Sequence, residues 1–229
     1  FPGIEEHEVA KLIRFVAELD DQVVNRRAFG TLGAPWEFNL RDTLRWLQLL
    51  TSKDFPGSAR DFLDTIFAQR FRSESDRVRL HRVFESQYGV HQPRISLFHN
   101  LSTQAIQVGL GLLPRDTALT RPDPMSTLRS SQLGPMEALL VSVKQNWPVI
   151  IVGPPGSGKT AMINQLASFV GTDLITFSMN ADVDAMDLVG GYEQLDPTRE
   201  VHRYLGQAEE IIRRHLATST THSAVHLRL

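Results

Sequence analysis

The sequence contains no cysteine, which excludes a disulfide scaffold and any metal site built on thiolates. Neither sign of charge dominates, because the formal net charge is −2. No overall positive field would therefore draw the chain to nucleic acid or to anionic lipid. No apolar run approaches the roughly 20 residues that a membrane-spanning helix needs. The remaining composition is that of a soluble globular protein with one large or two small domains.

The N-terminal stretch FPGIEEHEVAKLI lacks an initiator Met, and it also lacks the basic region and apolar core of a signal peptide. It enters a helical pattern almost at once. We interpret the sequence as a piece of a longer chain.

Four amphipathic stretches predict an all-helical unit over residues 1–90. They cover residues 4–24, a segment that begins after Asn39, and about 58–71 and 75–87. The side chain of Asn39 suits the cap of the second helix. Apolar residues recur at helical spacing and are expected to face inward. These residues are Ile4, Val9, Leu12, Ile13, Val16, Leu19, Val23, Leu40, Leu44, Leu47, Leu50, Phe62, Leu63, Ile66, Phe67, Val78, Val83 and Phe84.

Residues 91–124 predict a β-hairpin followed by a linker. In QAIQVGLGLL (104–113), Ile106, Val108, Leu110 and Leu112 alternate with Gln and Gly, which is the period of a strand. RISLFHN (94–100) is the candidate partner strand. LPRDTALTRPDP (113–124) is rich in turn-forming residues.

Residues 125–229 predict an α/β unit. Pro135 is expected to open a helix that runs through Val143. PVIIV (148–152) and DLITFSM (173–179) are predicted to be buried strands of a parallel sheet. Between them lies a predicted helix that ends at Gly171, and a last helix covers about 200–217. The inward face of the middle helix is predicted to hold Met162, Ile163, Leu166, Ala167 and Val170.

A glycine-rich loop joins the first of these strands to the middle helix. Residues 153–160 match the pattern G-x-x-x-x-G-K-[ST] in the strand-to-helix context that the pattern requires. Glycines let consecutive backbone N–H groups surround phosphates, and the helix N-terminus adds unpaired N–H groups. We predict binding of ATP or ADP with Mg²⁺: Lys159 reaches the β- and γ-phosphates, and the Thr160 hydroxyl binds the metal. The predicted binding residues are Gly153, Pro154, Pro155, Gly156, Ser157, Gly158, Lys159, Thr160 and Ala161.

Hydrolysis needs an acidic residue on Mg²⁺ at the end of another strand and a group that orients water. No apolar strand ending in Asp-Glu follows residue 160. Asp182, Asp184 and Asp187 follow the second predicted strand, but helix caps or a solvated face are the more common interpretation of such residues. The chain is therefore expected to bind a nucleotide without hydrolysing it efficiently alone.

Two segments resemble the midasin family of giant dynein-related AAA+ ATPases, which carry six AAA+ modules in one chain. They are PWEFNLRDTLRWLQLL (35–50), similar to a lid helix, and NADVDAMDLVGGYEQLD (180–196), similar to the segment after the second strand. The resemblance covers residues 1 to about 215. It implies a partial α/β P-loop core with a parallel sheet, preceded by an all-helical lid, at the junction of the third and fourth modules.

The resemblance also assigns roles to residues. Arg41 lies where AAA+ lids carry the sensor-2 arginine, and the alternative is a surface arginine paired with Asp42 or Glu37. Trp36 and Trp46 are expected in the lid core. Because the lid precedes the phosphate loop, Arg41 should serve the module before it and lie far from Lys159. The lid should then pack on the following core.

The Walker B acids, sensor 1 and arginine finger of the second module are missing from the sequence, and Gly190-Gly191 begins an insert or forms a simple turn. The family implies an ATP-driven motor that removes assembly factors from pre-60S ribosomal particles in the nucleus, both nucleolus and nucleoplasm. The implied partners are neighbouring AAA+ modules of the same chain and the pre-60S particle with its factors. Neither a direct nucleic-acid site nor a membrane is implied.

Three alternatives remain open. The chain could belong to another AAA+ protein, such as a MoxR-type chaperone or dynein. It could be a scaffold in which bound ATP braces adjacent modules without hydrolysis. The third alternative, a small nucleotide kinase, is less favoured because no Arg-rich lid follows the phosphate loop.

Overall fold

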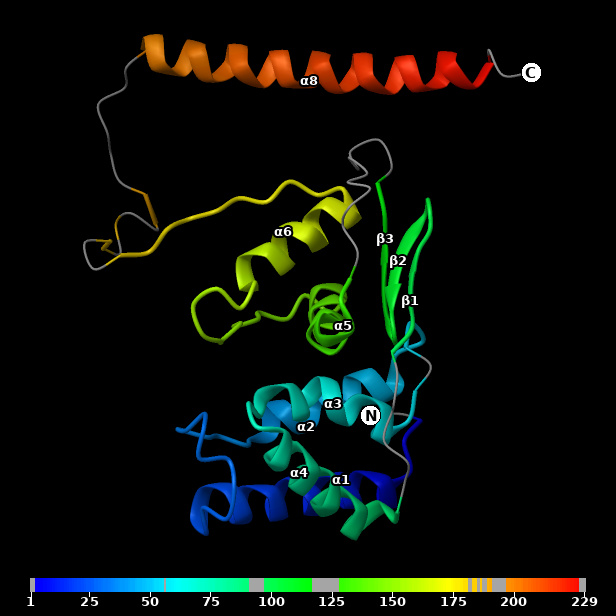
Figure 1. The fold of residues 1–229 in the computed structure, drawn as a ribbon, viewed down its shortest axis with the longest axis vertical. Helices are drawn as coiled ribbons and strands as arrows, with labels where there is room; N and C mark the ends of the chain where they lie inside the picture. Colours follow the sequence, from blue (N-terminus) through cyan, green and yellow to red (C-terminus); the bar gives the residue numbers. More distant parts are fainter. Residues whose placement is uncertain are drawn as a thin grey trace.

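The computed structural model describes residues 3–55, 57–90, 97–116, 128–180, 183–184, 186, 189–190 and 197–226. Two hydrophobic cores lie in these ranges. The first fills a helical unit, and the second lies between a hairpin and two helices (Figure 1). None of the helices in the described ranges combines the length and apolarity that crossing a bilayer requires.

Residues 3–55 and 57–90 form a helical unit, in the region where four helices are predicted. Its helices are α1 (Glu6–Asp20), a π-helical turn (Asp21–Asn25), α2 (Leu40–Thr51), α3 (Ala59–Ile66), a 3₁₀ turn (Ala68–Arg70) and α4 (Glu74–Tyr88). The predicted cap of α2 forms, because Oδ1 of Asn39 accepts a hydrogen bond from the backbone N–H of Arg41 at 3.0 Å. Asp42 reaches back to the N–H of Asn39 at 3.4 Å and completes a capping box.

Aromatic rings fill the core of the helical unit. Phe15 lies at its centre, edge-on to Trp46, Phe67 and Phe84 with centroid distances of 5.4 to 5.5 Å. The indole N–H of Trp46 donates to the carbonyl of Ala59 at 3.1 Å, so this buried polar atom is satisfied. Trp36 stacks on Phe71 at 4.6 Å and donates to the carbonyl of Gly30 at 2.6 Å. Trp46 therefore belongs to this core, as predicted, and Trp36 is partly buried and packs against it.

Several residues predicted to face inward are exposed. Ile13, Leu40 and Val78 are 54%, 70% and 43% exposed, and Leu44 is 38% exposed. The physical reason is ring size, because the bulky rings determine which face of each helix turns to the core. Helix α2 turns Thr43, Trp46, Leu47 and Leu49 inward instead.

The predicted hairpin is a three-stranded antiparallel sheet of β1 (His99–Leu101), β2 (Ala105–Val108) and β3 (Gly111–Pro114), in the order β1-β2-β3. The single strand predicted over 104–113 is wrong, because the chain turns at Gly109 with φ +53° and pairs Val108 with Gly111. The alternation changes phase there, so that Leu113 is buried while Leu112 is 43% exposed. The start of the predicted partner strand (94–96) and most of the predicted linker (117–124) lie outside the described residues.

Helix α5 (Ser130–Lys144) packs on the hairpin and on α3. It begins five residues before Pro135, so the prediction that Pro135 opens this helix is wrong. Gln132 caps its start by accepting a hydrogen bond from the N–H of Arg129 at 3.1 Å. Pro135 costs the helix one backbone bond because it has no N–H. The hairpin lies so close that a Cβ on Gly111 would be 2.6 Å from Cβ of Leu140.

Helix α6 (Lys159–Val170) packs on the same core through Met162, Leu166 and Phe169. It ends at Gly171 with φ +82°, as predicted. The last helix, α8 (Pro197–His226), extends beyond the predicted range of 200–217. Its large apolar side chains from Val201 to Leu216 are exposed, and it lies apart from the other helices (Figure 1).

The two predicted parallel strands do not form within the described ranges, where the hairpin is the sheet present. Residues 148–152 and 173–179 have no ladder partner, and Ile150 and Ile175 are 89% and 95% exposed. A strand is held by hydrogen bonds to a neighbouring strand, and the described residues provide none for either segment. Apolar runs of this kind predict a strand but do not supply its partner.

Candidate functional site

The glycine-rich loop lies at the N-terminus of α6, in the predicted position. Gly156 and Gly158 have φ of +76° and +83°, a region that residues with a Cβ rarely adopt. A Cβ on either residue would meet no atom within 4 Å, so the backbone conformation rather than space requires glycine there. The loop thus opens onto the first turn of α6, where N–H groups have no intrahelical partner.

The side chain of Lys159 folds back over the loop. Its ammonium donates to the carbonyls of Gly153 and Pro154, both at 2.8 Å. Pro154, Pro155, Gly156 and Ser157 are exposed, so an anion can reach this ammonium from solvent. A phosphate that approached the loop would offer Lys159 charged oxygens in place of the two carbonyls. The loop residues therefore fit a phosphate group.

Thr160 and Ala161 are exposed in the first turn of α6. Among the described residues no group of three or more His, Asp or Glu side chains could hold a metal ion.

Asp184 behaves as a local cap, because its Oδ1 accepts the N–H of Met186 at 2.7 Å. Asp182 and Asp187 lie outside the described residues. Gly190 has φ +87° and donates its N–H to the carbonyl of Met186 at 2.7 Å, which is consistent with the simple turn. The capping interpretation of Asp184 therefore agrees with the structure, and Gly191 lies outside the described residues.

Arg41 is exposed on the first turn of α2. This exposure agrees with the alternative of a surface arginine, but the described residues show other partners for Asp42 and Glu37. Asp42 pairs with Arg70 at 2.9 Å, and the Glu37 carboxylate accepts from the Asn39 amide at 2.8 Å. Arg70 was not predictable as the partner of Asp42, because it comes from a turn 28 residues further along the chain.

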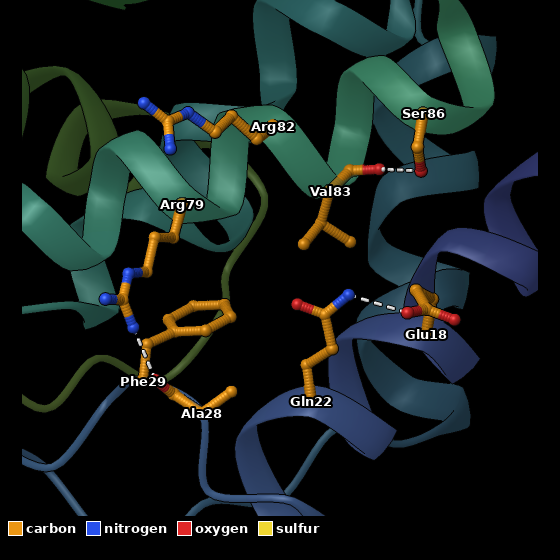
Figure 2. A pocket seen from close by; sticks show the side chains of 8 residues that line it. All are labelled: Glu18, Gln22, Ala28, Phe29, Arg79, Arg82, Val83 and Ser86. Carbon is orange, nitrogen blue, oxygen red and sulfur yellow. Dashed lines mark hydrogen bonds between the residues drawn. The ribbon is translucent and has the colours of Figure 1, made fainter.

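A separate hollow of about 420 Å³ lies between α1, the π-helical turn and α4 (Figure 2). Arg79 at its rim donates to the carbonyl of Ala28, and the amide of Gln22 donates to the Glu18 carboxylate at 2.6 Å. This hollow has no glycine loop and no helix N-terminus, so the phosphate loop remains the candidate site. Its lining residues are Glu18, Gln22, Ala28, Phe29, Arg79, Arg82, Val83 and Ser86.

Comparison with known proteins gives two family matches. Residues 1–91 match the midasin AAA lid domain, and residues 148–213 match an AAA domain of the dynein-related subfamily. Midasin from Dictyostelium discoideum is 29% identical over 238 residues, which covers 93% of this chain. Midasin from Giardia intestinalis is 31% identical over 195 residues, which covers 73% of the chain. The chain spans about 4% of the length of each of these relatives.

The lid match covers the helical unit, and the dynein-related match covers the phosphate loop and α6. The resemblance stated from the sequence is confirmed, as is an AAA domain preceded by a helical lid. The chain is thus a midasin-like member of the AAA+ family, in which a midasin-type lid precedes the phosphate-binding part of a dynein-related AAA domain.

Proposed function

We propose that this chain binds ATP or ADP with Mg²⁺ at residues 153–161, as part of an AAA+ motor. The observation that carries the proposal is the loop itself: Gly156 and Gly158 at positive φ, followed by Lys159 at the start of α6. The N–H groups of the loop and first helical turn surround the phosphates. Lys159 exchanges two carbonyl acceptors for the β- and γ-phosphates, and Thr160 binds the metal.

The parent protein is proposed to act as a motor that uses ATP to remove assembly factors from pre-60S particles in the nucleus. Similarity to two midasins over most of the chain supports this role. The partners would be adjacent AAA+ modules, the particle and its factors. The module junction would be that of the third lid and the fourth core.

A nucleotide-dependent brace is the alternative function. ATP turnover by the full-length parent with Lys159→Ala separates the two functions. If this site hydrolyses ATP, the Lys159→Ala parent turns over less ATP than wild type. If the site is a brace, the variant keeps the wild-type turnover, but its assembled ring is less stable.

The 229-residue chain alone is expected to release phosphate from ATP no faster than the buffer background. The arginine finger is absent, and such a residue supplies about 10³ to 10⁵ in rate in related NTPases. A phosphate-release assay with and without Lys159→Ala measures this. Clear phosphate release by the wild-type chain that is lost in Lys159→Ala would show that hydrolysis at this site does not need the arginine finger.

Arg41→Ala is expected to change the affinity of the loop for Mg·ATP by less than about twofold. Arg41 is on α2 in the helical unit, and Lys159 begins α6. Two groups on one phosphate each need a charge-assisted bond of about 2.7–2.9 Å. Calorimetry on the wild-type chain and the variant tests the separation. A tenfold loss would place both side chains on one nucleotide and contradict the assignment of Arg41 to the preceding module.

A further inference from the structure

The end of helix α5 is fixed by a Schellman motif. Asn146 adopts φ +54° and donates its N–H to the carbonyl of Val143 at 3.1 Å. The N–H of Trp147 donates to the carbonyl of Ser142 at 2.8 Å. These are the two bonds that define the motif, and an asparagine is suited to its left-handed position. The backbone therefore holds Trp147 at one place relative to α5.

The helical unit contacts this helix end at two points. The guanidinium carbon of Arg45, on α2, lies 5.1 Å from the ring centroid of Trp147, which is within the range of a cation–π contact. Nζ of Lys144 lies 3.9 Å from Oδ2 of Asp54, in the segment that follows α2. Trp147 also packs against the core of the helical unit. We call these four residues the joint.

The joint lies directly before the phosphate loop in the chain. Pro148 follows Trp147 and has a fixed φ, and Gly153 comes six residues after Trp147. Residues 148–152 have no ladder partner in the described ranges, so their path depends on what holds each end. Trp147 precedes this segment, and the phosphate loop that leads into α6 follows it.

Arg45 also lies one helical turn from Arg41. Residues four apart share a face of a helix, so α2 presents both arginines on the same side. The same helix thus carries the candidate sensor of one nucleotide and the residue that holds the approach to the next loop.

We propose that Arg45 is a positioning residue for the phosphate loop, acting through its contact with Trp147. Arg45 does not touch the nucleotide. Its planar guanidinium lies over the indole and restrains the end of α5, and this restraint limits the positions from which residues 148–152 enter the loop. Lysine offers the charge without the planar stacking, so it replaces Arg45 only in part. The effect on affinity rests on the proposed function, whereas the restraint itself does not.

The first measurement is hydrogen exchange on the 229-residue chain. The informative amides are those of Gln145, Asn146 and Trp147, each bonded to a carbonyl of α5. Arg45→Ala is expected to speed their exchange about three- to tenfold, with Arg45→Lys in between. The matched control is Arg14→Ala, an exposed arginine on α1, which should leave these amides at the wild-type rate. Equal exchange in Arg45→Ala and wild type would overturn the proposal.

The second measurement is the affinity for Mg·ATP by calorimetry on the same proteins. Arg45→Ala is expected to weaken it about two- to tenfold, and Arg14→Ala to leave it unchanged. Faster exchange with unchanged affinity would overturn the positioning role. If wild type itself does not bind Mg·ATP, the proposed function fails, and the exchange result still decides whether the contact restrains α5. Circular dichroism must show equal helix content in all variants.

Discussion

Replacing Lys159 with Ala is expected to weaken Mg·ATP binding to this chain by about 10- to 100-fold. Hydrogen bonds to charged groups contribute about 1.5–3 kcal/mol each, and this ammonium is the one cation that the loop itself provides. The glycine conformations at Gly156 and Gly158 survive the substitution, so weak binding through backbone N–H groups remains. Isothermal calorimetry gives the affinity directly.

Lys53→Ala is the matched control for this experiment, because Lys53 is an exposed lysine on the helical unit. It should bind Mg·ATP like wild type. Lys159→Ala also removes two hydrogen bonds within the loop, so circular dichroism must show that helix content is kept. Equal affinity in wild type and Lys159→Ala would refute the assignment of the loop.

Phe15→Ala is expected to destabilise the helical unit by about 3–5 kcal/mol, the usual cost of removing a large buried ring. Phe15 is fully buried and contacts three other rings edge-on. Ile13→Ala, two residues away on the same helix, is expected to cost less than about 1 kcal/mol because Ile13 is 54% exposed. The sequence alone predicted a core position for Ile13, so this pair tests the observed face of α1.

Urea unfolding followed by tryptophan fluorescence measures both variants. Trp36 and Trp46 report on the helical unit, because Trp46 is buried in its core and Trp36 packs against that core. The midpoint of Phe15→Ala should fall well below that of wild type, while Ile13→Ala stays close to it. Similar midpoints for the two variants would mean that α1 does not bury the face described here.

Features set by neighbouring residues were predictable from the sequence. The Asn39 cap, the Gly171 helix end and the glycine loop each depend on a few adjacent residues. Features set by distant residues were not. Trp46 turns α2 so that Leu40 and Leu44 face solvent, although their spacing matches an inward stripe.

The same distinction holds for the strands and the ion pairs. Residues 104–113 alternate as one strand would, but the chain turns at Gly109 and pairs Val108 with Gly111, so the stretch forms two strands. Asp42 forms its ion pair with Arg70, which is 28 residues away in the sequence, and not with the predicted partner Arg41. Apolar composition indicated strands at 148–152 and 173–179, but composition says nothing of where a partner strand would come from.

Because of helix α5, the two packed units of the structure do not coincide with the two regions that match family models. The match to the lid domain ends at residue 91, and the match to the AAA domain begins at residue 148, so α5 lies between the two. Yet Val141 of α5 is fully buried in the core of the helical unit, while Leu140 beside it is fully buried in the core of the hairpin. An exchange of lids between ring modules would therefore have to carry α5 along with the lid or recreate both of its faces. Recombination at either family boundary would cut through a shared core rather than through a spacer.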